Sequence, residues 1–138
     1  MKKSARQEML LKVHQELVKE AKVHGGSVVH YTLQGQRYDY DFTVIRADGS
    51  RKNIKVYTTT SASGNTAIGE KVINNGSIHY IILYAEGYGL CVFKRQDVVN
   101  AGNLTTDGRK HFSSILNNMP SQQIVLSAYN FRRLFLDI

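Results

Sequence analysis

The sequence contains few of the residues that cross-link or interrupt a protein chain. Its 138 residues include one cysteine, one proline and no tryptophan. A single cysteine, Cys91, excludes an internal disulfide bond and a zinc site built from several cysteines. Because Cys91 lies within an apolar run at 89–93, we expect a buried, reduced thiol in a cytoplasmic protein.

Long hydrophobic runs are also missing. The longest strongly apolar stretch spans residues 80–85, whereas a helix that crosses a bilayer needs ~20 apolar residues. The sequence has no internal repeat and no proline-rich linker, and its length suits one domain. We therefore predict a single domain over 1–138 with no membrane span, consisting of a core at about 1–100 and a helical part at about 101–138.

Acidic residues are outnumbered by basic ones. Eleven Asp and Glu face 18 Lys and Arg, which gives a formal net charge of +7. This surplus favours a phosphate-rich partner such as double-stranded DNA, although it also serves solubility. Basic residues at predicted turns and element ends suit phosphate contacts and solvated ends equally. The predicted nucleic-acid-binding residues are Arg37, Arg51, Lys52, Lys94 and Arg95.

Hydrophobic spacing predicts an α+β fold. Apolar residues recur at helical spacing from Leu10 to Ala21, and Gly25 with Gly26 ends this first helix. The remaining elements are expected as antiparallel strands at 27–33, 37–46 and 52–60, a helix at 66–74, strands at 77–85 and 89–94, and helices at 96–101, 107–118 and about 127–136. The predicted order is thus α-β-β-β-α-β-β-α-α-α.

The histidines show no spacing typical of a metal site. They are His14, His24, His30, His79 and His111. We interpret them as surface residues or as strand residues whose ring nitrogens have hydrogen-bond partners.

Acidic and basic residues meet on the predicted second and third strands. Asp41 begins an apolar run, a turn follows at 48–50, and Asn53, Ile54 and Lys55 begin the next strand. Together with the paired strands further on, residues 27–100 resemble the core of the PD-(D/E)xK nuclease superfamily, the restriction-endonuclease-like fold. In that family an acidic residue at the start of the second strand precedes an acid-x-Lys motif on the third. The resemblance implies a mixed central sheet with flanking helices and a Mg²⁺-dependent endonuclease.

The chemistry of phosphodiester hydrolysis explains why such residues would converge. A hard cation takes carboxylate and carbonyl oxygens, and a lysine offsets charge that develops on phosphorus. Asn53, Lys55 and Tyr57 share one face of their strand. A three-residue loop at 48–50 would place Asp41 opposite Tyr57 and diagonal to Lys55, whereas a two-residue turn would send Asp41 and Lys55 to opposite faces.

This sequence departs from the family motif at its second acid. In one alignment Asn53 takes the acid position and Lys55 is the motif lysine. In the other, Lys55 takes the acid position and Tyr57 the lysine position. The first alignment weakens metal binding, which Asp39 or Glu70 would restore, and the second excludes a divalent ion.

Two functions follow from these alignments. The first is a metal-dependent endonuclease in which Asp41, Asn53 and Lys55 are catalytic and Asp41 and Glu70 hold Mg²⁺. The second is an inactive nuclease-fold module, such as a mobile-element protein, that binds nucleic acid or inhibits a nuclease-containing defence complex. A homodimer is compatible with the first, because cutting both strands of a duplex usually takes two sites.

Overall fold

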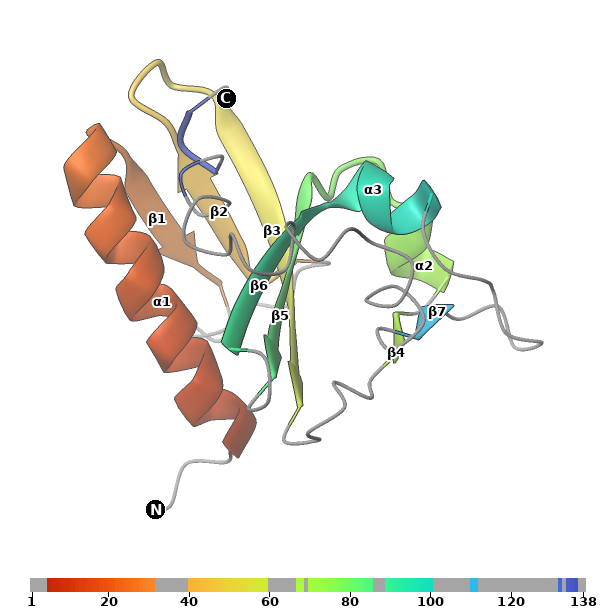
Figure 1. The fold of residues 1–138 in the computed structure, drawn as a ribbon. Helices are drawn as coiled ribbons and strands as arrows, with labels where there is room; N and C mark the ends of the chain where they lie inside the picture. Colours follow the sequence, from red (N-terminus) through yellow and green to blue (C-terminus); the bar gives the residue numbers. More distant parts are fainter. Residues whose placement is uncertain are drawn as a thin grey trace.

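The computed structural model describes residues 5–31, 40–59, 67–68, 70–85, 89–100, 110–111, 132 and 134–136. The elements are α1 (Ala5–His24), β1 (Ser27–His30), β2 (Phe42–Ile45), β3 (Arg51–Thr59), β4 (Ala67–Ile68), α2 (Glu70–Ile73), β5 (Tyr80–Ala85), β6 (Gly89–Lys94), α3 (Arg95–Asn100) and β7 (Lys110–His111) (Figure 1). Among the described residues, no helix combines the length and hydrophobicity required to cross a membrane.

Helix α1 confirms the prediction from helical spacing. Its buried residues recur every three or four positions and form one face: Met9, Leu10, Val13, Leu17 and Ala21. The helix ends where Gly25 adopts a left-handed conformation with φ of 73°, and the Gly26 N–H donates to the carbonyl oxygen of Ala21 at 2.9 Å. This is the Schellman arrangement that glycine favours at helix ends.

Five strands form a mixed sheet in the order β1-β2-β3-β5-β6. The first three strands are antiparallel neighbours, as predicted, and β5 and β6 form an antiparallel hairpin. Strand β5 runs parallel to β3 after the crossover through α2. The α+β class with a mixed sheet and flanking helices is therefore confirmed.

The helices lie on opposite faces of the sheet. Helix α1 packs on a face formed by Phe42, Val44, Ile54 and Val56, and Leu134 and Phe135 join the same core. A second core, which includes Ile81, Leu83 and Phe93, lies on the other face beside α2 and α3 (Figure 1). Strand β3 is central in the sheet, so its alternate side chains enter both cores.

The β2–β3 hairpin has a different register from the one predicted. Arg46 and Ser50 are joined by a backbone hydrogen bond of 2.8 Å around a loop at 47–49, in which Gly49 has φ of 87°. Glycine adopts this conformation without steric cost, so it takes the last position of the loop. Phe42 consequently pairs with Ile54. The prediction that Asp41 lies opposite Tyr57 is wrong, because the N–H of Asp41 donates to the carbonyl oxygen of Ile54.

Two helices predicted from the sequence are partly strands in the described part of the structure. The helix expected at 66–74 is helical only from Glu70 to Ile73, because Ala67–Ile68 pairs as a strand with Lys110–His111. The same pairing makes 110–111 a strand within the helix predicted at 107–118. Backbone pairing between segments far apart in sequence here overrides local propensity. The rest of that helix and most of the one at 127–136 lie outside the described residues.

Candidate functional site

Asp41 lies where β2 begins, at a local irregularity of the sheet. Its N–H donates to the carbonyl oxygen of Ile54 at 2.9 Å, and its carbonyl oxygen accepts the N–H of Tyr31 at 3.0 Å. Because Ile54 also pairs with Phe42, two consecutive residues of this strand face one residue of β3. This is the geometry of a β-bulge, which re-aims a side chain. It directs the Asp41 carboxylate toward the backbone N–H of Val56 on β3.

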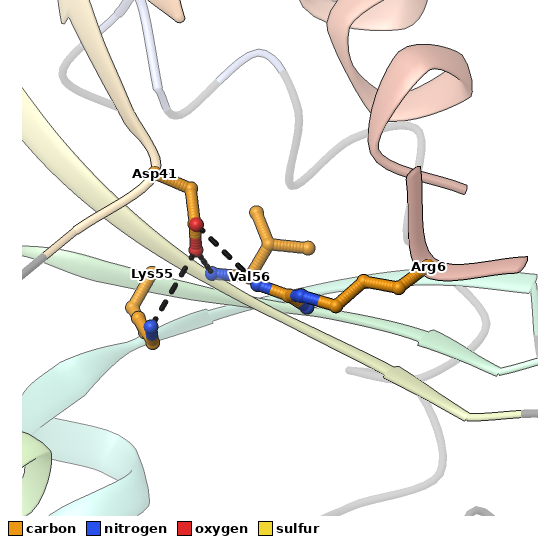
Figure 2. Close-up of polar contacts among 4 residues, drawn as sticks. All are labelled: Arg6, Asp41, Lys55 and Val56. Atoms are coloured by element: carbon orange, nitrogen blue, oxygen red, sulfur yellow. Dashed lines mark hydrogen bonds and ion pairs between the residues drawn. The ribbon is translucent and has the colours of Figure 1, made fainter. Parts of the chain in front are cut away.

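The carboxylate of Asp41 meets one backbone donor and two cations (Figure 2). Its Oδ2 accepts the N–H of Val56 at 2.9 Å and lies 3.8 Å from Nζ of Lys55. Its Oδ1 lies 3.4 Å from a terminal guanidinium nitrogen of Arg6. The side chain is only 7% exposed, and a buried carboxylate requires such compensation. We call Asp41, Lys55, Arg6 and the Val56 N–H the Asp41 cluster.

The two cations reach Asp41 from different sides of the sheet. Arg6 belongs to α1, which packs on the face that contains Ile54 and Val56. Lys55 alternates with these residues and projects from the opposite face, where its Nζ lies 5.9 Å from the ring centre of Tyr57. The carboxylate therefore lies beside β3 with a positive group on either side, and the three side chains together carry a net charge of about +1.

Asn53 lies on the same face of β3 as Lys55 and is held by side-chain hydrogen bonds. Its Oδ1 accepts the hydroxyl proton of Thr43 at 2.9 Å, and its Nδ2 donates to the carbonyl oxygen of Ser77 at 2.9 Å. Thr43 has only one hydroxyl proton, so in its 2.8 Å contact with Tyr31 the tyrosine hydroxyl donates. Asn53 thus has a neutral side-chain oxygen that hydrogen bonds hold in place.

The donor set limits how a metal could be held. Within the described ranges, no group of three or more His, Cys, Asp or Glu side chains is close enough to bind one ion. The backbone of Glu70 begins α2, whereas its side chain and Asp39 lie outside the described residues. Mg²⁺ commonly binds through one or two carboxylates, waters and substrate phosphates. This mode needs as little as one carboxylate from the protein, and Asp41 supplies one.

Positive residues gather where β5 begins. Burial first, and then the positive charges of Lys52, Arg95 and Arg46, lower the pKa of His79. Arg95 also donates to the carbonyl oxygens of Ile78 at 3.0 Å and Ile73 at 2.6 Å, which ties the end of α2 to the start of α3. The sequence did not indicate this structural role.

The other predicted basic contacts are dispersed along the described chain. Arg51 and Lys94 are exposed, and Lys52 is half-buried. Arg37 lies outside the described residues. The positions of the exposed residues are compatible with phosphate contacts and with solvated strand ends.

His30 corrects the interpretation of the histidines. Its ring is buried, stacks on Phe42 with centroids 4.3 Å apart, and lies 5.0 Å from the ring centre of His14. Neither ring nitrogen of His30 has a hydrogen-bond partner among the residues that the structure describes. Burial is the main cause that lowers the pKa of His30 to about 4, and the neighbouring His14 adds to it. Asp41 has the opposite, smaller effect. His30 is therefore neutral near pH 7 and unfavourable to protonate.

Comparisons with known proteins give a coarse structural likeness. No protein-family model and no curated protein matches this sequence. A solved structure of the bacterial homing endonuclease I-Ssp6803I is similar, with 17% sequence identity and a TM-score of 0.44. The match covers 86% of this chain and 91% of that chain. The PD-(D/E)xK resemblance stays a prediction.

Proposed function

We propose that this protein acts on DNA as a metal-dependent endonuclease, with Asp41 and Lys55 as its catalytic pair. The observation that carries this proposal is the buried Asp41 carboxylate at the start of β2, 3.8 Å from Nζ of Lys55 on the adjacent strand. A carboxylate and a lysine on neighbouring strands are the two charges that phosphodiester hydrolysis uses. The positive charge of the chain supports DNA as the substrate.

Each residue has a distinct chemical role. Lys55 offsets the negative charge that develops on the phosphate oxygens and orients the attacking water. Asp41 would hold Mg²⁺, with the carbonyl oxygen of Asn53 as a neutral ligand and Glu70 as a further carboxylate. When bound, the ion supplies Lewis-acid polarisation of the phosphate and lowers the pKa of a bound water. The N–H of Val56 keeps the Asp41 carboxylate in place at 2.9 Å.

Lys55→Met tests the lysine's role in a plasmid-cleavage assay with Mg²⁺ or Mn²⁺. We expect cleavage to fall about a hundredfold, because the positive charge near the reacting phosphate is lost. Lys22→Met removes an exposed lysine at the far end of α1 and should cleave like the wild type. Cleavage by Lys55→Met at the wild-type rate would contradict the assignment. Linear product without prior nicking would indicate that two copies act together, as a homodimer would.

A second candidate function is a nuclease-fold module that binds nucleic acid or a nuclease-containing complex without cutting. The observation that favours it is Asn53, whose oxygen already accepts the Thr43 hydroxyl and which has no charge to hold a cation. This candidate predicts DNA binding with a steep dependence on salt and no cleavage with either metal. Absence of DNA binding at low salt would favour a protein partner.

Asn53→Asp is expected to strengthen divalent-ion binding. The substitution places a second carboxylate two residues before Lys55, on the same face of β3. It also removes the hydrogen bond that the Asn53 side-chain amide donates to the Ser77 carbonyl oxygen. We expect the Mg²⁺ concentration for half-maximal binding to fall about tenfold, because another carboxylate oxygen joins the site. Calorimetric titration of Mg²⁺ without DNA measures the change in affinity. The matched control is Asn53→Ala, which loses the same hydrogen bond to Ser77 but gains no carboxylate. Equal Mg²⁺ affinity in all three proteins would show that residue 53 lies outside any metal site.

A further inference from the structure

Arg6 occupies a position that the catalytic pair does not explain. It lies in the first turn of α1, whose next turn is anchored by the buried Met9 and Leu10. The backbone of Arg6 is therefore held against the sheet, while its side chain is 45% exposed. The guanidinium nevertheless reaches across 35 residues of sequence to Oδ1 of Asp41.

The contact between Arg6 and Asp41 is weak enough for Arg6 to exchange it for a contact with a phosphate. At 3.4 Å it is longer than the 2.7–3.2 Å of a strong N–H···O hydrogen bond. Oδ2 of the same carboxylate already accepts the Val56 N–H and faces Lys55. A second cation gives the cluster a net positive charge, which an arriving phosphate would neutralise. Arginine also matches the geometry of a phosphate, to which it donates two parallel hydrogen bonds.

We propose that Arg6 is a phosphate-binding residue of this site, which rests on Asp41 in the free protein and moves to a backbone phosphate when DNA binds. The inference rests on the proposed function and adds a DNA contact on α1. A phosphate of the DNA backbone accepts two parallel hydrogen bonds from the guanidinium and so replaces the carboxylate as the partner of Arg6. Asp41 and the DNA phosphate therefore compete for Arg6.

The test measures DNA binding in EDTA, so that it does not depend on cleavage. The probe is a fluorescently labelled DNA duplex titrated at several salt concentrations. We expect Arg6→Ala to bind about tenfold more weakly, with a salt slope smaller by about one unit, because one phosphate contact is lost. Arg6→Lys should fall between Arg6→Ala and the wild type, since lysine keeps the charge but not the paired donors. Lys22→Ala, which removes one charge from the other end of α1, should bind like the wild type.

A double variant distinguishes phosphate binding by Arg6 from a purely structural role in which Arg6 only holds the Asp41 carboxylate. Asp41→Asn should tighten metal-free DNA binding about tenfold, and this gain should shrink when Arg6→Ala is also present, because the two residues are coupled. Unchanged binding by Arg6→Ala, or the same gain in both backgrounds, would overturn the inference. Wild-type protein that binds DNA through Arg6 but cuts no plasmid would overturn only the proposed hydrolysis. Circular dichroism checks folding, and Arg6→Gln replaces Arg6→Ala if the latter does not fold.

Discussion

Asp41→Asn is expected to reduce Mg²⁺-dependent DNA cleavage at least about a thousandfold while the protein stays folded. Asparagine keeps the shape of aspartate, and its Oδ1 can still accept the Val56 N–H that Asp41 accepts at 2.9 Å. The negative charge, however, is lost beside Lys55 and Arg6. Without that charge no divalent ion is held next to Lys55, so the variant should lose cleavage activity but remain folded.

Asp41→Ala separates the structural and chemical roles of the carboxylate. Alanine removes the acceptor as well as the charge, which leaves the backbone N–H of the buried Val56 without this partner. We expect this variant to be inactive and also less stable than Asp41→Asn by about 1–3 kcal/mol. Urea unfolding measures the stability difference, and the plasmid assay measures cleavage. Cleavage by either variant within tenfold of the wild type would remove Asp41 from the catalytic pair.

His30 is expected to make the protein lose stability in mild acid. Its folded-state pKa of about 4 lies below the ordinary value of 6.5. Between these pH values the folded protein binds fewer protons than the unfolded chain, so the free energy of unfolding falls as the pH falls from about 6.5 to about 4. The shift corresponds to a loss of about 3 kcal/mol. Above pH 6.5 this contribution to stability is fully present.

Substitution at His30 and His14 tests the origin of this acid sensitivity. His30→Phe should flatten the pH dependence of urea unfolding between about 4 and 6.5. At pH 7 the variant should be no less stable than the wild type, because two ring nitrogens without a hydrogen-bond partner in the described part of the chain leave the core. The charged groups that influence His30 are His14 on α1, which lowers its pKa, and Asp41, which raises it. His14→Gln should therefore raise the pKa of His30 and reduce the loss in acid. A pH dependence unchanged by His30→Phe would assign the acid sensitivity to other residues.

The sequence by itself determined the elements whose signals are local. The apolar spacing of α1 predicted this helix, and the glycines that end it predicted its C-terminal end within about one residue. Alternating runs separated by polar turns predicted the antiparallel strands, and the β6 boundaries agree with the prediction. These features depend on neighbours within a few positions, so the pattern of apolar residues and turn formers was sufficient. The presence of Asp41 and Lys55 on adjacent strands followed from the same pattern.

Only the tertiary structure decided how the site is built. The hairpin register depended on which loop residue took the left-handed conformation, and Gly49 placed the loop one residue earlier than expected. The bulge at Asp41 then turned its carboxylate toward the Val56 N–H. Arg6 and His30 carry no local signal of their roles, because each depends on α1 packing against strands that lie far away in the sequence. Charge and periodicity are properties of the chain, but the pairing of a carboxylate with a guanidinium 35 residues away arises only when the helix and the sheet share one core.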